Sequence, residues 1–510
     1  LVGSEMCIRD SYMYTSSNTW IASVWEFAYQ GLDRANLAIA SIEQMEGYEG
    51  NTALQELVGQ AKFLRAFLAF DLVRFFGDVP FSVDYTSGYE QTSKPRMDRE
   101  LIYDQIIDDL NFAKEHLYVG SAVASSEIPC KGAARALLMR VYLQRAGYSL
   151  SSTTGKLTRP DDTTRKSYFE AVIREWETFK VEGYHNFYGG GYEQLFKNYS
   201  QLILNNQESL WEIAFEPNQG QTDNSGMWAT YNGPIVDAPG SYSGTSSYMG
   251  RANAFFTVLP YWKSFYESNA DGSQKDVRRD VNFVDYAYVW NATTETQDKS
   301  YTASSIAKSL YRYPGKWRRE WMALGFVDPN HTGVNYCPLR YADVVLMAAE
   351  AYNETNNTTE AWKLLNDVRQ RAEATPITSA NYASLMKAPK VYNLDFIDDS
   401  DDAGKFRTAL YWERGFELCY EGQRKYDFLR WGCLGDALRA AQAYIESWYP
   451  DANEYINAST LQSWDPVSWA SSNYVAGHNF VDGKHELYPI PLAEIQSNAA
   501  LNGQNNPGFE

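Results

Sequence analysis

The sequence predicts a mainly α-helical protein, with a tetratricopeptide-like helical scaffold interrupted by a loop-rich, irregular region. Three observations support this fold class. Apolar residues recur at steps of three and four along both ends of the chain, which is the period of helices with one buried face. Residues 183–337 are instead rich in Gly, Pro, Ser, Asn and aromatic residues, and their helical periodicity is weak. Alanines at the expected packing positions of the C-terminal helices allow close helix pairs, as in helical arrays.

Four segments follow from these patterns. The opening string LVGSEMCIRDS lacks the features of a signal peptide and resembles translated sequencing-adapter DNA. We therefore expect residues 1–11 to be non-native and the native N-terminus to be missing. Residues 12–182 are predicted to form an N-terminal helical scaffold. Residues 183–337 are predicted to bind the ligand, because long irregular regions in compact proteins usually carry function. Residues 338–510 are predicted to form a C-terminal helical scaffold with a turn-rich tail.

Helical periodicity predicts five helices in the N-terminal scaffold, within residues 20–44, 54–78, 98–117, 131–148 and 165–182. The expected buried stripe of the second helix is Leu57, Ala61, Leu64, Leu68, Leu72 and Phe75. Gly77 and Pro80 are predicted to end that helix. Asp98 is predicted to cap the third helix at its N-terminus. The buried stripe of the third helix is expected to be Ile102, Ile106, Leu110, Ala113 and Leu117.

The second half of the chain begins with the stretch SLWEIAF, residues 209–215, which has the pattern of a short strand with Trp211 in the core. Two helices are predicted farther on. One buries the face Tyr341, Val345, Ala348 and Tyr352, and the next buries Ala361, Leu365, Val368 and Ala372. The tail ELYPIPLAEIQSNAALNGQNNPGF is rich in turn residues and is predicted to contain only one short helical segment.

The composition narrows the class of function. A count of 45 Lys and Arg against 64 Asp and Glu gives a net charge of −19, which repels phosphate backbones and argues against nucleic-acid binding. Hydrophobic residues at 44% are typical of globular proteins, and no apolar run is long enough to cross a bilayer as a helix. The five cysteines and five histidines are scattered without CxxC or HExxH spacing. We therefore expect buried structural thiols, and neither a metal nor a cofactor.

The most concentrated charges lie in WERGFELCYEGQRKYDFLRWG, residues 412–432. Glu413, Glu417 and Glu421 would stack on one face if the stretch is helical. Such carboxylates point the same way, whereas a glycosidase acid pair must face each other across a sugar. We therefore interpret these acids as structural, paired with arginines of neighbouring helices, and expect Glu417→Gln to cost about 1–3 kcal/mol of stability. The same structural set includes Arg414, Arg424 and Asp427.

A second acidic stretch, FIDDSDDAG, contains Asp398, Asp399, Asp401 and Asp402. Its oxygen atoms are of the kind that bind calcium, but the spacing of an EF-hand is absent. We favour a solvated loop in which Asp402 caps the helix that follows.

Aromatic residues make up 15% of the chain, and their rings can stack on sugar rings. Trp228, Tyr231, Tyr242 and Tyr248 lie among Gly, Ser and Asn without a helical period, so we predict that they bind the ligand, with Asn232 as a hydrogen-bonding partner. Their alternative role is to pack a small cluster beneath the loop. A further predicted ligand-binding residue, near the N-terminal end of the first helix, is Trp20.

Eight stretches together resemble one family: WEFAYQGLDRANLAI, QAKFLRAFLAFDLVRFFGDVP, IYDQIIDDLNFAKEHL, KGAARALLMRVYLQRAGY, LRYADVVLMAAEAYNET, ALYWERGFELCYEGQRKYDFLRWG, ELYPIPLAEI and QNNPGF. In this order they resemble the SusD/RagB family of nutrient-binding outer-membrane lipoproteins. The resemblance implies a tetratricopeptide-like scaffold whose loop-rich part carries the ligand site. It also implies a place on the external face of the outer membrane, held by an N-terminal lipid whose cysteine is missing from this chain.

The resemblance further implies a function without catalysis. Members of the family cap a SusC-type TonB-dependent transporter and deliver oligosaccharides or other nutrients to it, and they are not enzymes. We therefore expect glycan capture at the cell surface, with no catalytic residues. Two alternatives remain open from the residues alone. One is a glycoside hydrolase on a helical scaffold, and the other is a cytosolic tetratricopeptide-type adaptor that binds peptides.

Overall fold

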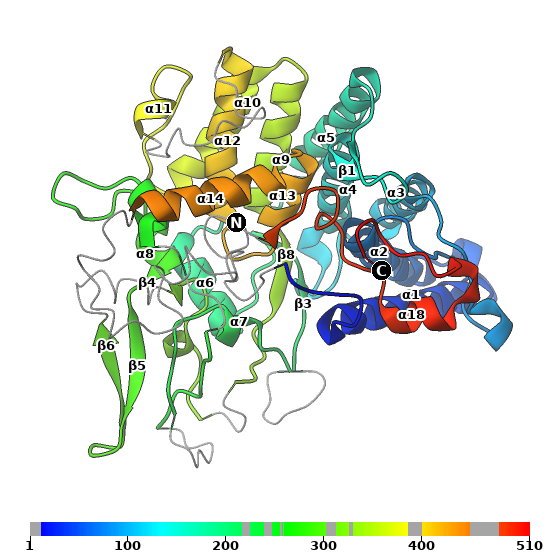
Figure 1. Ribbon diagram of the computed structural model, residues 1–510, viewed down its shortest axis with the longest axis horizontal. Coiled ribbons are helices and arrows are strands. Elements are labelled where there is room, and N and C mark those ends of the chain that lie inside the picture. Colours follow the sequence, from blue (N-terminus) through cyan, green and yellow to red (C-terminus); the bar gives the residue numbers. More distant parts are fainter. Residues whose placement is uncertain are drawn as a thin grey trace. The chain divides into compact units, whose positions relative to one another are not determined.

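The computed structural model describes residues 12–216, 225–238, 247–254, 258, 260–301, 313–325, 330–385, 400–448 and 479–509. Contacts group the chain into two compact units. Unit 1 includes Asn186–Lys425 and Gly435–Phe480, and unit 2 includes Tyr12–His185, Tyr426–Leu434 and Val481–Glu510. The predicted fold class is confirmed, because helices dominate the regular structure of both units (Figure 1). The predicted non-native segment 1–11 lies outside the described residues, and the division into functional segments stays a prediction.

Unit 2 contains the five predicted helices, and each packs against the next one along the chain. They are α1 Thr19–Glu43, α2 Thr52–Phe76, α3 Arg99–His116, α4 Lys131–Ala146 and α5 Asp162–Glu182. The predicted N-cap of α3 is confirmed, since the Asp98 carboxylate accepts a hydrogen bond from the Glu100 amide at 2.9 Å. Gly77 ends α2 with φ of 74°, a conformation that favours glycine.

The buried stripe predicted for α2 is partly wrong. Ala61 and Leu72 are buried, but Leu57 and Leu64 are 46% and 39% exposed. α2 packs against both α1 and α3, so it buries a broad face. Because the helix is apolar on nearly all sides, its periodicity could not identify which residues face the neighbouring helices. The buried residues of α2 include Val58, Ala61, Phe63, Ala66, Phe67, Ala69, Phe70, Leu72, Val73 and Phe76.

The long connection between α2 and α3 is held against α1 by a chain of buried polar groups. Arg65 of α2 forms an ion pair with Asp109 of α3 at 2.6 Å, and its Nη1 donates to Asn36 Oδ1 of α1 at 3.0 Å. The Asn36 amide then donates to the carbonyls of Ser82 and Asp84, at 3.0 and 3.1 Å. The connection is therefore anchored to the helical core of unit 2.

The tail of the chain supports the same connection from another side. Helix α18, Leu492–Ser497, is the predicted short helical segment. After it, the Asn498 side chain donates to the Lys94 carbonyl at 3.0 Å and accepts from the Ser93 hydroxyl at 3.0 Å. The Asn506 amide donates to the carbonyls of Phe76 and Tyr488, at 2.9 and 2.7 Å, and so joins the tail to the end of α2. The short strands β1 Ser149–Leu150 and β2 Leu157–Thr158 complete the sheet structure of unit 2.

Unit 1 is centred on three helices that pack on one another: α9 Tyr341–Glu354, α10 Thr358–Arg371 and α12 Asp402–Leu418. The apolar face predicted for α10 is confirmed as buried, whereas on the predicted face of α9 Val345, Ala348 and Tyr352 are buried and Tyr341 is half-buried. Other described helices that lie mainly in unit 1 are α6 Tyr192–Ser200, α7 Trp228–Tyr231, α8 Arg278–Asn282, α11 Tyr382–Leu385 and α14 Leu434–Trp448. Helix α13, Arg424–Arg430, contains the boundary between the two units. Short 3-10 helices within the described residues are Tyr48–Gly50, Tyr89–Gln91, Gly120–Ala122, Pro260–Phe265, Arg319–Trp321 and Ala499–Leu501.

Three antiparallel strand pairs lie in the described part of unit 1. The predicted strand SLWEIAF contains β3, Ser209–Ile213, which pairs with β8, Tyr336–Arg340. The second pair is β4 Phe283–Val284 with β7 Tyr313–Pro314. The third is the hairpin of β5 Tyr286–Asn291 and β6 Thr296–Tyr301, at the lower left of Figure 1. All three pairs contain residues of the region predicted to be loop-rich.

The prediction that Asp402 caps the helix after the acidic stretch is wrong. The N-cap of α12 is Asp401, whose carboxylate accepts from the Gly404 amide at 2.7 Å, and Asp402 is already the first helical residue. Asp402 cannot cap the helix because its own backbone is helical. Asp398 and Asp399 lie outside the described residues.

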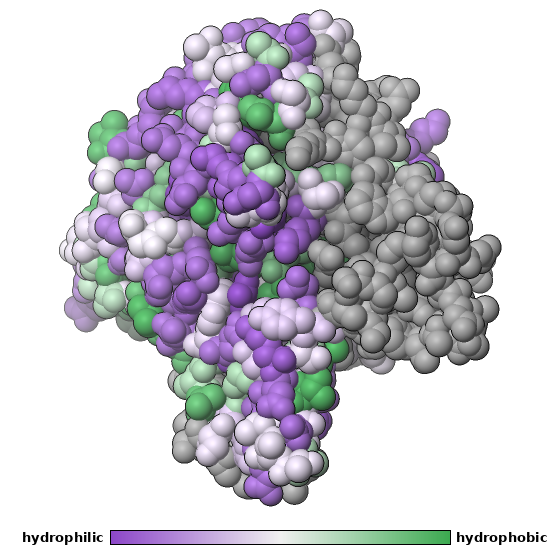
Figure 2. All heavy atoms as spheres, turned by 90° about the vertical axis from the view of Figure 1, so that its left-hand side faces the viewer, coloured by the Kyte–Doolittle hydropathy of each residue, from purple (hydrophilic) through white to green (hydrophobic). Residues whose placement is uncertain are grey.

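The face of the described chain that Figure 2 shows is mainly polar. Hydrophilic side chains cover most of the coloured atoms in Figure 2, and hydrophobic ones are scattered among them. Within the described ranges, no helix combines the length and the apolar composition that crossing a membrane requires.

Candidate functional site

The β5–β6 hairpin belongs to a small, irregular β layer within the loop-rich part of unit 1. Val236 forms a parallel bridge with Tyr288 of β5 and an antiparallel bridge with Ala252. The backbone amide of Tyr288 donates to the Ile235 carbonyl at 2.9 Å, and the Asp237 amide donates to the Tyr288 carbonyl at 2.9 Å. These bonds attach the hairpin to the segment that follows α7.

One side of this hairpin is aromatic. Side chains alternate along a strand, so Tyr286, Tyr288 and Trp290 of β5 share a side with their partners Tyr301, Lys299 and Gln297 of β6. Tyr286 is buried, Tyr288 and Trp290 are half-buried, and Tyr301 is 66% exposed. We call the set Tyr248, Tyr286, Tyr288, Trp290, Lys299 and Tyr301 the hairpin face. Its rings range from the buried Tyr286 to the exposed Tyr301.

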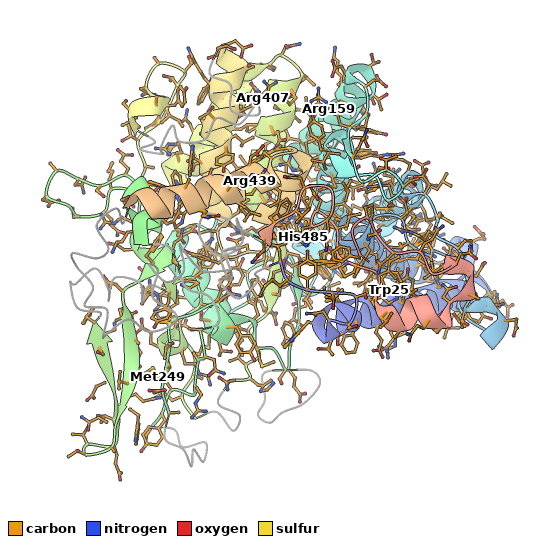
Figure 3. The ribbon with its side chains drawn as sticks, viewed as in Figure 1. Trp25, Arg159, Met249, Arg407, Arg439 and His485 are labelled. Carbon is orange, nitrogen blue, oxygen red and sulfur yellow. The ribbon has the colours of Figure 1, made fainter. Side chains whose placement is uncertain are left out.

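Tyr248 joins the hairpin face from a separate segment. Its ring meets the edge of Trp290 at a centroid distance of 5.2 Å. The next residue is fixed by the hairpin itself, since the Met249 amide donates to Gln297 Oε1 at 2.8 Å; Figure 3 labels Met249 beside β5. The Tyr248 carbonyl accepts from the Gly325 amide at 3.0 Å. The peptide unit that links Tyr248 to Met249 is therefore held at both its carbonyl and its amide.

A carboxylate organises the polar groups of the hairpin face. The hydroxyls of Tyr286 and Tyr288 both donate to Glu320, and Lys299 Nζ lies 3.5 Å from Glu320 and 3.6 Å from the centroid of the Tyr286 ring. Burial would raise the pKa of Glu320, but the two tyrosine hydrogen bonds and the charges of Lys299 and Arg318 together lower this pKa. Glu320 is thus an ionised acceptor that keeps both tyrosine rings in place.

Helix α7 carries a second aromatic group. It is a single helical turn, so Trp228 and Tyr231, three residues apart, lie at neighbouring positions. Trp228 is half-buried and meets the Trp317 ring at 5.4 Å and the Tyr336 ring at 4.7 Å, while the Tyr231 hydroxyl donates to Met227 Sδ at 2.8 Å. Both residues belong to the loop-rich region, and Trp228 also packs in a small aromatic cluster with Trp317 and Tyr336.

The other predicted ligand-binding residues lie in different settings. Asn232 is buried, and its amide donates to the Trp228 carbonyl at 3.3 Å, so it holds the end of α7. Tyr242 lies outside the described residues. Trp20 is 72% exposed on α1 of unit 2, while the other described candidates belong to unit 1. Of the predicted ligand-binding residues that the structure describes, Tyr248 lies on the hairpin face. Binding of the ligand by the other candidates stays a prediction.

Two family models match the chain. The model described as "SusD family" matches residues 207–509, and the model described as "Starch-binding associating with outer membrane" matches residues 4–143. The first covers more than half of the sequence. The chain belongs to the SusD family.

Related proteins support the same assignment. SusD-like protein P2 of Formosa agariphila is 27% identical over 511 aligned residues, which cover 98% of this chain and 83% of that protein. The crystal structure of a SusD homolog from Bacteroides thetaiotaomicron superposes with a TM-score of 0.77 at 25% identity, covering 100% of this chain and 90% of that one. Surface glycan-binding protein A from Bacteroides fluxus superposes with a TM-score of 0.63 at 18% identity, covering 96% and 85%. At 18% identity, the likeness to the Bacteroides fluxus protein shows similarity of fold alone.

In this SusD-family chain, Glu413, Glu417 and Glu421 lie in a buried charge cluster within unit 1. We use this name for Asp276, Glu208, Glu413, Glu417, Glu421, Arg278, Lys316, Arg340, Arg369 and Arg371. Arg278 Nη1 lies 2.6 Å from Glu413 and 3.1 Å from Glu417, and Arg340 Nη1 lies 2.6 Å from Glu417. Arg371 also pairs with Glu417. Five acids and five bases thus neutralise one another out of contact with solvent.

The geometry of this cluster corrects the sequence prediction in one respect. Helix α12 ends at Leu418, and Tyr420 and Gly422 adopt φ of 70° and 78° in the turn that follows. Glu421 therefore does not stack on a helix face with Glu413 and Glu417. The turn instead brings its carboxylate to Lys316 and Arg340.

The remaining residues of the predicted structural set have separate partners. Arg414 pairs with Asp343 of α9 at 2.8 Å, and the Arg424 guanidinium lies 4.4 Å from the centroid of the Tyr411 ring. Asp427 pairs with Arg430 at 2.8 Å in unit 2. Within the described ranges, no group of three or more His, Cys, Asp or Glu side chains is gathered as a metal site requires. The stabilising role of the set stays a prediction.

Stability is expected to depend on pH through Glu417. Burial would raise the pKa of this carboxyl, but the charges of Arg371, Arg340, Arg278 and Lys316 lower it far below its ordinary value. A carboxyl group whose pKa is lower in the folded than in the unfolded state stabilises the protein at pH values above the unfolded-state pKa, which is about 4.3 for Glu. We expect the free energy of unfolding to fall as the pH drops below about 5, and to fall less steeply in Glu417→Gln. Urea titrations of the wild type and of Glu417→Gln at a series of pH values measure the free energy of unfolding. An equally steep fall of this free energy with pH in both proteins would contradict the prediction.

Sequence reasoning missed two groups of residues. The alternation of aromatic residues in YAYVW, within β5, indicates a strand with one aromatic side, and it could have identified the hairpin face. The basic members of the buried charge cluster gave no such signal. Arg278 is 135 residues from Glu413 in the chain, and no local pattern relates them. Their pairing is visible only in the folded unit.

Proposed function

We propose that this protein captures oligosaccharides at the outer surface of the cell and delivers them to a SusC-type TonB-dependent transporter. The description "Starch-binding associating with outer membrane" of the model matching residues 4–143 supports both the ligand class and the location. The name of the glycan-binding relative from Bacteroides fluxus agrees with this ligand class. An N-terminal lipid would hold the protein on the external face of the outer membrane. The function needs binding and release, without catalysis.

The main structural support for this proposal is the hairpin face. Sugar rings present apolar C–H faces that stack on aromatic rings, and their hydroxyls need polar partners beside those rings. Trp290, Tyr248 and Tyr301 offer ring surface, and Lys299 and Glu320 supply a donor and an acceptor next to it. The bonds from Glu320 to the tyrosines hold the rings before a ligand arrives, which reduces the entropy lost on binding.

The sequence-based candidates remain part of the proposal. Tyr248 lies on the hairpin face, and we propose that Trp228 and Tyr231 of α7 line the adjoining part of the loop-rich region. The two groups are joined by the segment 317–321, because Trp317 contacts Trp228 and Glu320 accepts from the hairpin tyrosines. Several rings along one region would select the shape of a glycan chain rather than a single sugar.

Capture without turnover is the expected behaviour. Isothermal titration against malto-, laminari-, cello- and xylo-oligosaccharides should give a heat of binding for at least one series. Chromatography of the same mixtures after long incubation should recover oligosaccharides of unchanged length, because the carboxylates of the 412–432 stretch are engaged by buried bases. Shortened products would instead favour the glycoside hydrolase alternative. Binding of peptides without binding of any glycan would favour the adaptor alternative.

A further inference from the structure

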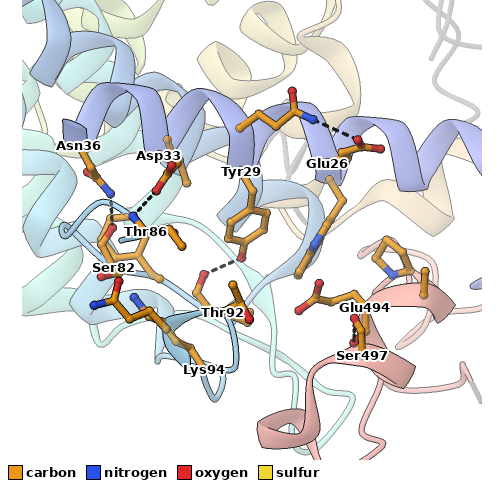
Figure 4. A pocket seen from close by; sticks show the side chains of 18 of the residues that line it. Glu26, Tyr29, Asp33, Asn36, Ser82, Thr86, Thr92, Lys94, Glu494 and Ser497 are labelled. Carbon is orange, nitrogen blue, oxygen red and sulfur yellow. Dashed lines mark hydrogen bonds between the residues drawn. The ribbon is translucent and has the colours of Figure 1, made fainter. Parts of the chain in front are cut away.

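Unit 2 contains a cavity of about 630 Å³ that lies between α1, the connection after α2 and α18 (Figure 4). Cavities of this size are typical of small-molecule sites. It is separate from the hairpin face, which belongs to unit 1. Its lining residues include Trp25, Glu26, Tyr29, Gln30, Asp33, Ser82, Asp84, Thr86, Gln91, Lys94, Glu494 and Ser497. We call it the α1 pocket.

The walls of the α1 pocket are fixed by hydrogen bonds. The Tyr29 hydroxyl donates to the Pro80 carbonyl at 2.5 Å, and Asp33 Oδ1 accepts from the Thr86 amide at 2.6 Å. Together with the bonds from Asn36 to the carbonyls of Ser82 and Asp84, they attach the connection to α1 at successive turns of the helix. On the other side, Asn498 holds the Lys94 carbonyl. The pocket is therefore formed before a ligand binds.

The charges around the α1 pocket are strongly unequal. The carboxylates of Glu26, Asp33, Asp84 and Glu494 line it, and among its lining residues the only basic side chain is Lys94. Asp33 and Glu494 are half-buried, where a charge interacts more strongly than at an open surface. An anionic ligand would be repelled and a cationic ligand attracted.

The hydrogen-bonding groups of the α1 pocket point to the same class of ligand. One oxygen of Glu26 accepts from Gln30 at 3.0 Å, one of Asp33 from Thr86, and one of Glu494 from Asn498 at 2.9 Å. The second oxygen of each carboxylate receives no hydrogen bond from a described residue. Ionised carboxylates only accept hydrogen bonds, so the pocket requires a ligand that is rich in donors.

We propose that the α1 pocket binds an amino sugar, a ligand that carries a protonated amine beside several hydroxyls. The ammonium group pairs with the free oxygen of Glu494, and neighbouring hydroxyls donate to Glu26 and Asp33 and exchange hydrogen bonds with Ser82 and Thr86. Trp25 and Tyr29, whose ring centroids are 4.8 Å apart, supply the aromatic wall. This site adds a selectivity for cationic sugars that the proposed capture of glycans on the hairpin face does not include.

The test compares three tetrasaccharides by isothermal titration at mildly acidic pH and low salt. The probes are the tetramer of β-1,4-linked glucosamine, its fully N-acetylated form and tetragalacturonate. The glucosamine tetramer should bind, the acetylated form should bind at least about tenfold more weakly, and tetragalacturonate should not bind, because one charge-assisted hydrogen bond is worth about tenfold or more in affinity. Added salt should weaken binding of the glucosamine tetramer.

Matched variants locate the site. The double variant Glu26→Gln/Glu494→Gln should weaken binding of the glucosamine tetramer by about tenfold or more. Glu46→Gln/Glu49→Gln removes the same charge from exposed positions of unit 2 outside the pocket and should leave the affinity within about twofold. Binding should persist in Trp290→Ala, so failure of the hairpin face cannot be confused with failure of this site. Three outcomes would overturn the proposal. They are equal binding of the cationic and acetylated tetramers, no binding of either tetramer, and equal loss of affinity in the two double variants.

Discussion

Glu417→Gln is expected to lower the free energy of unfolding by about 3–5 kcal/mol, the range for removing one partner of a buried ion pair. Glu417 has no solvent exposure and contacts Arg278, Arg340 and Arg371. A neutral amide of the same size would leave these guanidinium groups with a deficit of negative charge in a region that water does not reach. The expected cost exceeds the 1–3 kcal/mol expected from sequence because three bases, rather than one, depend on this carboxylate.

Urea denaturation at neutral pH measures this effect, with Glu193→Gln as the matched control. Glu193 is an exposed residue of α6 that pairs with Lys197 at 3.0 Å, and exposed pairs contribute about 1 kcal/mol at most. Glycan affinity in the folded fraction of Glu417→Gln should equal that of the wild type. Full stability combined with loss of glycan binding would move the 412–432 stretch from the scaffold to the ligand site.

Trp290→Ala is expected to weaken binding of the best glycan by about 1–3 kcal/mol, the range for an aromatic residue at the centre of an interface. Trp290 is half-buried on the hairpin face, so its loss removes a stacking surface and also releases the Tyr248 ring. The helical core of unit 1 does not depend on this side chain. The melting temperature should therefore change little while the affinity falls.

Two further variants sharpen this experiment. Val289 lies on the opposite side of β5 and is 46% exposed, so Val289→Ala should leave glycan affinity unchanged. Trp228 packs against Trp317 and Tyr336, so Trp228→Ala should lower the melting temperature as well as the affinity. Unchanged affinity in a folded Trp290→Ala protein would place the glycan site away from the hairpin face, with the α7 residues and Trp20 as the next candidates.

Local patterns determined a large part of the fold. The stripes of α3 and α10 are buried as predicted, because a helix with one apolar side has only one way to remove that side from water. The same reasoning failed for α2, whose apolar residues surround the helix. There the neighbours α1 and α3 decided that Val58 and Phe63 are buried and that Leu57 and Leu64 are not.

The sites depended more strongly on tertiary structure. The order of the motifs in the sequence was enough to identify the SusD family. The helical spacing of Glu413 and Glu417 argued against a pair of acids that face each other across a sugar. The partners of Glu417 were decided only by folding, since Arg278 and Arg340 lie 139 and 77 residues from Glu417 in the chain. The hairpin face and the α1 pocket were likewise decided by contacts between distant segments. Helical periodicity is a property of neighbouring residues and can be read along the chain, whereas charge pairing and cavities arise from side chains that meet only when the chain is folded.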